Sequence, residues 1–314
     1  MSLASLENPT NTHSSLAREP LIPGEIVGRP LGKFERSVSL VGWGYNEEDL
    51  VREFVDRAYA MMSEHVADFE IVLVNDGSTD RTGEILDQAA REYPQLRVIN
   101  FPQNKGIGEA ANQAIAAATK DYLFWQTMDW SYDLTDLRYF LEMTKHFDVV
   151  AGVRRSPISS GSKMAFFRRA SSHIQKRSDN LMKAIVSVSN YLVVRLLFNF
   201  PMSDYQNITF YPTRLIQSIE MESRSSFGNP EYLMKSCWKG ASILEVPIAF
   251  IPRVKGEAKG TRVGSILKSV SDILKLWFRW IVVQRLPFQV KKGSIRRLVP
   301  SEWNHATRKR NASL

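Results

Sequence analysis

The sequence is poor in the features that stabilise secreted or membrane-spanning proteins. Its only cysteine is Cys237, which excludes an internal disulfide and a structural thiolate zinc site. No uninterrupted apolar run approaches the roughly 20 residues that a membrane-spanning helix needs. Residues 1–35 mix serine, asparagine, proline and charges without the apolar core of a secretory signal. We therefore expect a flexible N-terminal tail followed by a cytoplasmic protein.

The composition indicates a folded and basic chain. Of its 314 residues, 44% are hydrophobic and 11% are aromatic, which excludes wholesale disorder. The formal net charge of +8 predicts attraction to an anion: a nucleic acid, a phosphate-bearing substrate or an acidic membrane face. The five histidines show no metal-ligand spacing, and no stacking motif for nucleic acid is present. Charge alone does not choose among these partners.

The N-terminal half alternates short β-branched runs with segments of helical period, between Arg36 and Gly152. This alternation predicts an α/β fold with a mainly parallel sheet that helices cover on both faces. The expected strands are Ser37–Trp43, Glu70–Asn75, Leu96–Asn100, Tyr122–Met128 and Asp148–Gly152. Asn46 is an N-cap candidate for the first helix, and Ser78 or Thr79 for the second.

The regular alternation stops after Gly152, and residues 156–262 are expected to complete the same domain on its acceptor side. Strands are expected at 206–211 and 242–251, with a short helix at 231–239 between them. Residues 263–288 form an amphipathic helix, in which Lys268, Asp272, Lys275 and Arg279 line a narrow polar stripe. This helix either packs on the domain or lies in a membrane interface. A basic tail is expected from 289 to 314.

Clusters of polar residues come directly after several predicted strands. In a parallel sheet the carboxyl ends of the strands lie at one edge, so these clusters are expected to lie close together. Asp76, Gly77 and Ser78 come directly after the second strand, and Asp129 follows the fourth. Ligands of open α/β sheets bind at this edge, where a carboxylate accepts hydrogen bonds and glycine permits close approach of the backbone. Helix capping alone would explain one such cluster. Four clusters on one edge favour a ligand site, the other two being 45–48 and 104–108.

These clusters resemble a known family. The region from Ser37 to Arg155 is similar to family 2 glycosyltransferases of the GT-A fold, and most similar to those that glycosylate a polyprenyl or dolichyl phosphate. Four motifs carry the resemblance: Tyr45-Asn46-Glu47-Glu48, Val74-Asn75-Asp76-Gly77-Ser78-Thr79-Asp80, Asn104-Lys105-Gly106-Ile107-Gly108 and the acidic motif that ends in Asp129. The stretches 246–250 and 253–259 resemble the closing segment of the family.

The resemblance implies a role for each matched residue. Residues 36–155 would bind a UDP- or GDP-sugar, through Tyr45, Asn46, Glu47, Asp76, Gly77, Ser78, Asn104, Lys105 and Gly106. Asp129 would act in catalysis by holding Mg²⁺ or Mn²⁺ on the diphosphate. The acceptor phosphate would be bound by Arg154, Arg155, Arg253 and Lys259. The implied reaction moves a sugar, with inversion, to a lipid-linked phosphate at the cytoplasmic membrane face, where the protein would be peripheral.

The sequence departs from the family pattern at two positions of this edge. Thr127 stands where the first aspartate of an Asp-x-Asp motif is usual, and Trp43 stands where proline is common. Two alternatives stay open. A hydroxyl acceptor, on a glycolipid or a soluble glycan, would need a general base, for which Glu231 is the candidate. A non-catalytic nucleotide-sugar binder would also tolerate the missing carboxylate. Nucleic-acid binding is suggested by charge alone and is not expected.

Overall fold

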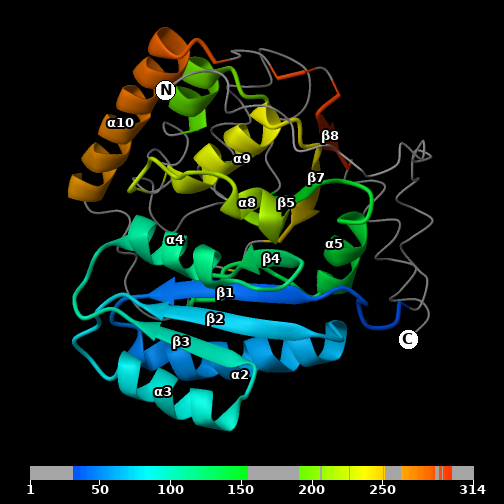
Figure 1. Ribbon diagram of the computed structural model, residues 1–314, viewed down its shortest axis with the longest axis vertical. Helices are drawn as coiled ribbons and strands as arrows, with labels where there is room; N and C mark the ends of the chain where they lie inside the picture. Colours follow the sequence, from blue (N-terminus) through cyan, green and yellow to red (C-terminus); the bar gives the residue numbers. More distant parts are fainter. Residues whose placement is uncertain are drawn as a thin grey trace.

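The computed structural model describes residues 31–154, 191–205, 207–225, 227–249, 251, 263–286, 290–291 and 293–298. An eight-stranded sheet in the order β3-β2-β1-β4-β6-β5-β7-β8 forms its centre (Figure 1). The strands are β1 Val38–Gly44, β2 Phe69–Asn75, β3 Leu96–Asn100, β4 Tyr122–Trp125, β5 Val149–Arg154, β6 Ile208–Pro212, β7 Ile243–Ile248 and β8 Ile295–Arg297.

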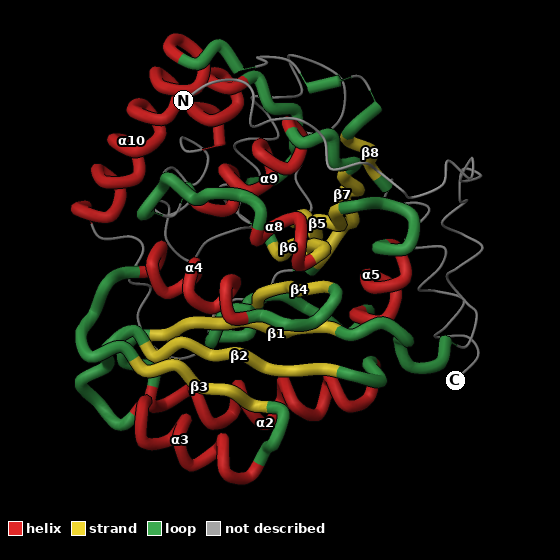
Figure 2. The backbone as a smooth tube through the Cα atoms, in the orientation of Figure 1, coloured by secondary structure: helices red, strands yellow, loops and turns green. Residues whose placement is uncertain are grey.

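Helices cover both faces of the sheet (Figure 2). They are α2 Glu48–His65, α3 Thr82–Glu92, α4 Ile107–Ala117, α5 Leu137–Met143, α8 Thr213–Gln217, α9 Gly228–Trp238, α10 Val263–Trp277 and the π-helix η4 Phe278–Val283. Side chains of α2, α3 and α5 share one apolar core with the sheet, and those of α4, α8, α9, α10 and η4 share the other. Successive residues of a strand point to opposite faces, so Leu40 enters the first core and Val41 the second.

The strand directions place the carboxyl ends of seven strands at one edge, those of all strands except β6. β1 is parallel to β2 and β4, and β2 is parallel to β3. β6 runs antiparallel to both β4 and β5, so β5 regains the direction of β4, and β7 is parallel to β5. The chain leaves β1 toward β2 on one side and β4 lies on the other, which makes the carboxyl ends of β1 and β4 the topological switch point of the sheet. The predicted mainly parallel sheet is confirmed.

Several expected boundaries were wrong. A tail was predicted to run through residue 35, but Phe34 is fully buried and its amide donates to His65 O at 2.7 Å, while residues 1–30 lie outside the described residues. The tail predicted from residue 289 contributes β8, which pairs with β7, and Leu298 is buried. Short strands such as β8 have little periodicity of their own, and their pairing depends on a distant neighbour.

The helix caps expected at Asn46, Ser78 and Thr79 were also wrong. Helix α2 begins after Glu47 and α3 begins after Arg81, and neither has a side-chain cap bond at that residue. The expected cap residues instead bond to each other across two loops, as described below. Local sequence favours capping by such residues, but here the neighbouring loop offered competing donors and acceptors.

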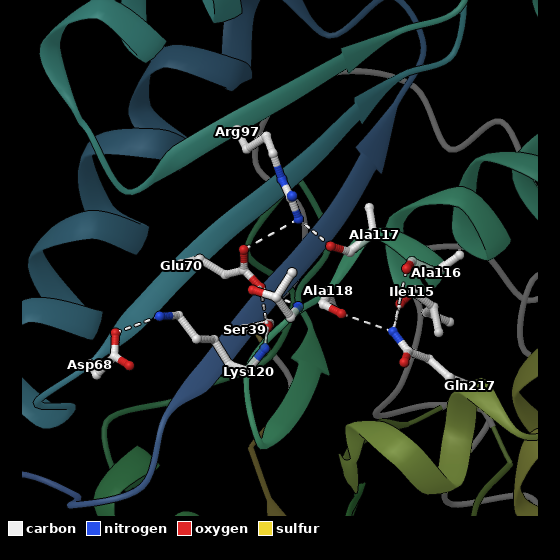
Figure 3. Close-up of polar contacts among 11 residues, drawn as sticks. Ser39, Asp68, Glu70, Arg97, Ile115, Ala116, Ala117, Ala118, Lys120 and Gln217 are labelled. Carbon is white, nitrogen blue, oxygen red and sulfur yellow. Dashed lines mark hydrogen bonds and ion pairs between the residues drawn. The ribbon is translucent and has the colours of Figure 1, made fainter.

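The amino ends of the strands are tied together by a polar network around Glu70 (Figure 3). The Oε1 atom of Glu70 accepts hydrogen bonds from Ser39 Oγ at 2.7 Å and from the Thr119 amide at 2.6 Å. Gln217 Nε2 donates to the carbonyls of Ile115 and Ala118, each at 2.9 Å. These bonds satisfy carbonyls at the C-terminal end of α4. Helix α4 is thereby fixed at its far end, and its N-terminus faces the carboxyl edge.

The amphipathic segment predicted at 263–288 is the continuous helix formed by α10 and η4. Ile273, Leu276 and Trp280 are buried against the domain, so one apolar face packs as the sequence allowed. Within the described part of the chain, no helix is long and apolar enough to cross a membrane.

Candidate functional site

Asp76 links two loops at the carboxyl edge. Its carboxylate accepts hydrogen bonds from the amides of Lys105, at 2.7 Å to Oδ1, and of Gly106, at 3.0 Å to Oδ2. Its own amide donates to Gly44 O at 2.9 Å. The side chain is buried. A buried carboxylate with two amide donors is held in one orientation, so the ends of β1 and β2 and the start of α4 form one rigid unit.

Gly77 allows the turn after β2 to pack directly against the loop before α4. It has a φ of +66°, in the left-handed region. A Cβ atom at this position would lie 2.2 Å from Gln103 C and 2.4 Å from Asn104 N, both of them backbone atoms. Only glycine fits, because neither backbone atom can move away without opening the loop that Asp76 holds. Asn104 and Lys105 are exposed beside it, and Lys105 Nζ lies 4.4 Å from the centre of the Phe101 ring.

The loop after β1 is tied to the loop after β2 by side chains. Ser78 Oγ accepts from the amide of Asn46 at 3.0 Å, and Asn46 Oδ1 accepts from the amide of Thr79 at 2.8 Å. The amide of Glu47 donates to Thr82 Oγ1 at 2.8 Å. Tyr45, Asn46 and Glu47 are all half-buried. The structure therefore brings together the residues expected to bind a nucleotide sugar.

Asp129 lies after β4, on the other side of the switch point. A Cβ atom on Gly44 would lie 3.3 Å from Glu47 Cγ and 3.4 Å from Met128 Cγ, so the loops after β1 and β4 are in contact. Ser131 Oγ donates to Asp129 Oδ1 at 2.5 Å. Trp130, with a φ of +53°, is buried beneath Arg57, whose guanidinium carbon lies 4.4 Å from the ring centre. This packing orients the loop that carries Asp129.

The polar side chains next to Asp129 form hydrogen bonds within their own loop. Thr127 is exposed, and its Oγ1 accepts from the amide of Ser131 at 3.1 Å. Asp133 Oδ1 accepts from the amide of Thr135 at 3.0 Å, which makes Asp133 a turn residue. Among the described residues, no group of three or more His, Cys, Asp or Glu side chains is placed to hold a metal ion. A single carboxylate is still compatible with Mg²⁺, which is commonly bound by one or two carboxylates together with substrate phosphates.

Arg154 is at the same edge, at the end of β5. Its Nε and Nη2 atoms form a bidentate ion pair with the two carboxylate oxygens of Asp204, at 2.6 and 2.8 Å. Burial acts to lower the pKa of Arg154, but Asp204 outweighs it and raises that pKa above its usual value. Asp204 thus fixes the orientation of this guanidinium and balances its charge. The other three expected phosphate ligands, Arg155, Arg253 and Lys259, lie outside the described residues.

Glu231 does not fit the role of a general base. Its carboxylate is fully buried and accepts from the amides of Glu222 and Ser223, each at 2.8 Å, and from Lys235 Nζ at 2.6 Å. Burial raises the pKa of this carboxyl group, although Lys235 and the two amides act in the opposite direction. The side chain anchors α9 to the preceding loop. The sequence showed a first-turn glutamate but not the three donors that surround it.

Sequence reasoning missed Asp204, which is 50 residues from its partner Arg154. It also missed Trp130 as the residue that fixes the Asp129 loop. An aspartate in an irregular stretch and a tryptophan after a strand have no local pattern that reveals such contacts. Burial raises the pKa of the Cys237 thiol to about 12, which disfavours the thiolate at neutral pH.

Comparison with known proteins shows which proteins this chain is similar to. Residues 44–194 match the model of the family "Glycosyl transferase family 2". The glycosyltransferase AglD of Haloferax volcanii is 26% identical over 262 residues, which cover 81% of this chain and 39% of that protein. The undecaprenyl-phosphate mannosyltransferase of Micrococcus luteus is 25% identical over 215 residues, which cover 66% of this chain and 82% of that protein.

Solved structures show the same fold at lower identity. The mannosyltransferase PcManGT of Pyrobaculum calidifontis, in complex with GDP-Man and Mn²⁺, has a TM-score of 0.53 at 14% identity, and the match covers 90% of this chain and 77% of that one. Glucosyl-3-phosphoglycerate synthase of Mycobacterium tuberculosis, in complex with Mn²⁺, UDP and glucosyl-3-phosphoglycerate, has a TM-score of 0.52 at 15% identity and covers 77% of this chain and 80% of that one. The expected GT-A fold is confirmed.

Proposed function

Because the chain carries a family 2 glycosyltransferase domain of the GT-A fold, we propose that it moves a sugar from a nucleoside diphosphate to a lipid-linked phosphate, with inversion. One observation carries the proposal. The turn at Asp76 and Gly77 is held in one conformation by its contacts with residues 103–106, and we call it the locked turn; it lies beside the loop that bears Asp129. The turn would supply a preformed site for the nucleotide at the switch point. The loop would supply a carboxylate, that of Asp129, beside this site. The relative from Micrococcus luteus acts on undecaprenyl phosphate by its name.

Asp129 is the residue that would hold a divalent cation, in company with the diphosphate. Bound there, Mg²⁺ or Mn²⁺ would neutralise the charge that develops on the departing nucleoside diphosphate. Ser131 donates to one carboxylate oxygen of Asp129 and so limits its rotation. The packing of Trp130 under Arg57 holds the same loop in place. These residues orient the carboxylate before any ligand arrives.

A phosphate acceptor suits the acceptor side better than a hydroxyl. A phosphate monoester is already charged at neutral pH and needs a cation for positioning, not a base for deprotonation. We assign this position to Arg154, whose guanidinium Asp204 orients at this edge. Glu231, the base that a hydroxyl acceptor would require, is enclosed by its own donors. Holding donor and acceptor together would then provide much of the rate enhancement.

Donor binding and transfer test the function directly. We expect UDP- or GDP-sugars to raise the unfolding temperature of the full chain with Mn²⁺ present, because a ligand stabilises the state that binds it. Transfer from the donor that binds is then measured with undecaprenyl phosphate, and with an undecaprenol of the same chain length as the matched control. Transfer to the alcohol but not to the phosphate would contradict the acceptor assignment. Binding without turnover on either would favour a nucleotide-sugar-binding protein.

We also propose that α10 and η4 lay their outward face on the membrane that holds such an acceptor. Four apolar residues spaced by four positions are exposed there: Val270 by 41%, Leu274 by 50%, Phe278 by 56% and Val282 by 46%. The opposite face of the same helix is packed in the core. Lys275 and Arg279 are exposed, and each follows one of these apolar residues by one position, about 100° round the helix. An apolar row bordered by cations fits an anionic bilayer surface.

Vesicle flotation tests this face. We expect the wild-type chain to float with vesicles of phosphatidylcholine and phosphatidylglycerol, and the Leu274→Ser/Phe278→Ser variant to lose at least about tenfold in partitioning, since each exposed side chain would bury apolar surface. Ile107→Ser is the matched control, because Ile107 is 54% exposed but begins α4. Equal flotation of all three proteins would contradict the proposal. A dimer that dissociates on Leu274→Ser/Phe278→Ser, without vesicle binding, would assign the face to a second copy.

A further inference from the structure

Residues 221–225 form a segment that lies between α10 and the N-terminus of α4, and we call it the strap (Figure 1). A Cβ atom on Gly108, in the first turn of α4, would lie 2.9 Å from Arg224 Cα and 3.0 Å from Arg224 C. The backbone of the strap therefore rests directly on the first turn of α4. No side chain intervenes, so a shift of either backbone must move the other.

The other side of the strap is held by α10. Asp272 Oδ2 accepts hydrogen bonds from Ser223 Oγ at 3.2 Å and from the amide of Arg224 at 3.3 Å. Asp272 thus binds the same residue, Arg224, whose backbone touches Gly108. It is the one acidic residue in the described part of α10. The sequence placed it in the polar stripe of an amphipathic helix.

The strap is also fixed at its beginning. Glu222 Oε1 accepts from Trp280 Nε1 and from Lys235 Nζ, each at 2.9 Å. The amides of Glu222 and Ser223 donate to the buried carboxylate of Glu231. Helix α9 and η4 therefore hold residues 222 and 223, which leaves Asp272 and Gly108 to set the position of Arg224.

The first turn of α4 determines how Asp76 is held. The amides of Lys105 and Gly106, which donate to Asp76, directly precede Ile107, the first residue of α4. The far end of α4 is already fixed by Gln217. A displacement of Gly108 therefore moves the N-terminal end of α4, which is next to the amides of Lys105 and Gly106.

We propose that Asp272 is a positioning residue for the nucleotide: through the strap it fixes the first turn of α4 and, with it, the amides that orient Asp76. The proposal rests on the proposed function for the use of Asp76, but the contacts that define it do not. It assigns α10 a second role beside its outward face, because the helix that would lie on a membrane also steadies the donor site. The site would then be complete only when α10 is seated.

Two substitutions release the strap from opposite sides. Asp272→Ala removes both hydrogen bonds, and Gly108→Ala pushes the strap away. We expect either to raise the Kd for UDP or GDP, measured by calorimetry with Mn²⁺, about three- to tenfold, which corresponds to the loss of one or two hydrogen bonds. Alanine is the better helix former, so a rise in Gly108→Ala cannot come from weakening α4 itself.

Matched variants separate positioning from other effects. Asp272→Asn keeps an oxygen that accepts both bonds, and should stay within about twofold of wild type. Lys275→Ala, an exposed change on the same helix, should also leave Kd unchanged. Arg224→Ala keeps the backbone contacts and should do the same. An Asp272→Asn variant as impaired as Asp272→Ala would overturn the hydrogen-bonded route, and a loss confined to Arg224→Ala would assign the effect to direct binding by its guanidinium.

Hydrogen exchange gives a readout that does not depend on ligand. The amides of Lys105 and Gly106 should exchange faster in Asp272→Ala and Gly108→Ala than in wild type, at a temperature well below unfolding. Unchanged exchange and unchanged Kd in both variants would overturn the proposal. If the wild-type chain binds neither UDP nor GDP, the proposed function fails, and the exchange rates still decide whether the strap positions α4.

Discussion

Asp129→Asn is expected to lower glycosyl transfer by about a hundred- to a thousandfold, because it removes the charge that would hold a cation on the leaving diphosphate. Asparagine has nearly the same shape and can still accept the hydrogen bond from Ser131, so the loop should keep its conformation. The initial rate with saturating donor and acceptor, measured over a range of Mn²⁺ concentrations, reports the loss. Because Thr127 supplies no second carboxylate, added Mn²⁺ should restore little of it.

The matched control is Asp133→Asn in the same loop. Asp133 accepts from Thr135 in a local turn, so its neutral variant should stay within about threefold of the wild-type rate. Nucleotide affinity measured without metal should be similar in both variants, since the base and ribose would be held at the Asp76 side. Full activity of Asp129→Asn would show that this carboxylate does not carry the metal. Equal losses in both variants would point to a general disturbance of the loop.

Gly77→Ala is expected to destabilise the chain by about 2–4 kcal/mol, the sum of left-handed backbone strain and overpacking against fixed atoms. The added Cβ atom would meet backbone atoms of Gln103 and Asn104, at 2.2 and 2.4 Å, which cannot rotate away as a side chain could. The loop that donates to Asp76 must then shift, so nucleotide affinity should fall at least about tenfold. Urea unfolding gives the first quantity and calorimetric titration with UDP or GDP the second.

Gly240→Ala separates backbone strain from the clash. Gly240 has a φ of +89° after α9, but no atom lies within 4 Å of the position its Cβ would take. Its alanine variant should lose only about 1–2 kcal/mol and bind nucleotide as the wild type does. If Gly77→Ala were no more destabilised than Gly240→Ala, the contact with residues 103 and 104 would not be essential. A Gly77→Ala chain that bound nucleotide normally would contradict the locked turn.

The part of the candidate site around Asp76 was predictable because its residues are adjacent in the sequence to strand ends. A buried strand followed by Asp76-Gly77-Ser78 places a carboxylate and a tight turn at the carboxyl edge whatever the rest of the chain does. The parallel order of β1, β2, β3 and β4 follows from the βαβ pattern, which leaves few arrangements. Exact helix starts were not predictable, because Asn46 and Ser78 had partners in a neighbouring loop that local propensity does not register.

The roles of residues in the C-terminal half were not predictable in the same way. Glu231 reads as a helix glutamate, and only the fold brings Lys235 and the amides of Glu222 and Ser223 around it. In the sequence Asp272 belongs to a polar stripe, and only the packing of α10 places it on the strap. In each case the role depends on residues that are near in space, and the partner often lies tens of positions away in the sequence.

The sequence by itself determined the α/β class, the carboxyl edge as the place of the site, and Asp76 and Asp129 as the carboxylates on it. Strand period, turn residues and the alternation of elements are local properties, and they suffice for these conclusions. The tertiary structure decided that Glu231 is an anchor, that Arg154 is held by Asp204, that β8 belongs to the sheet and that Asp272 of α10 holds the strap. Burial and hydrogen bonding set these roles, and both arise only when distant segments pack together.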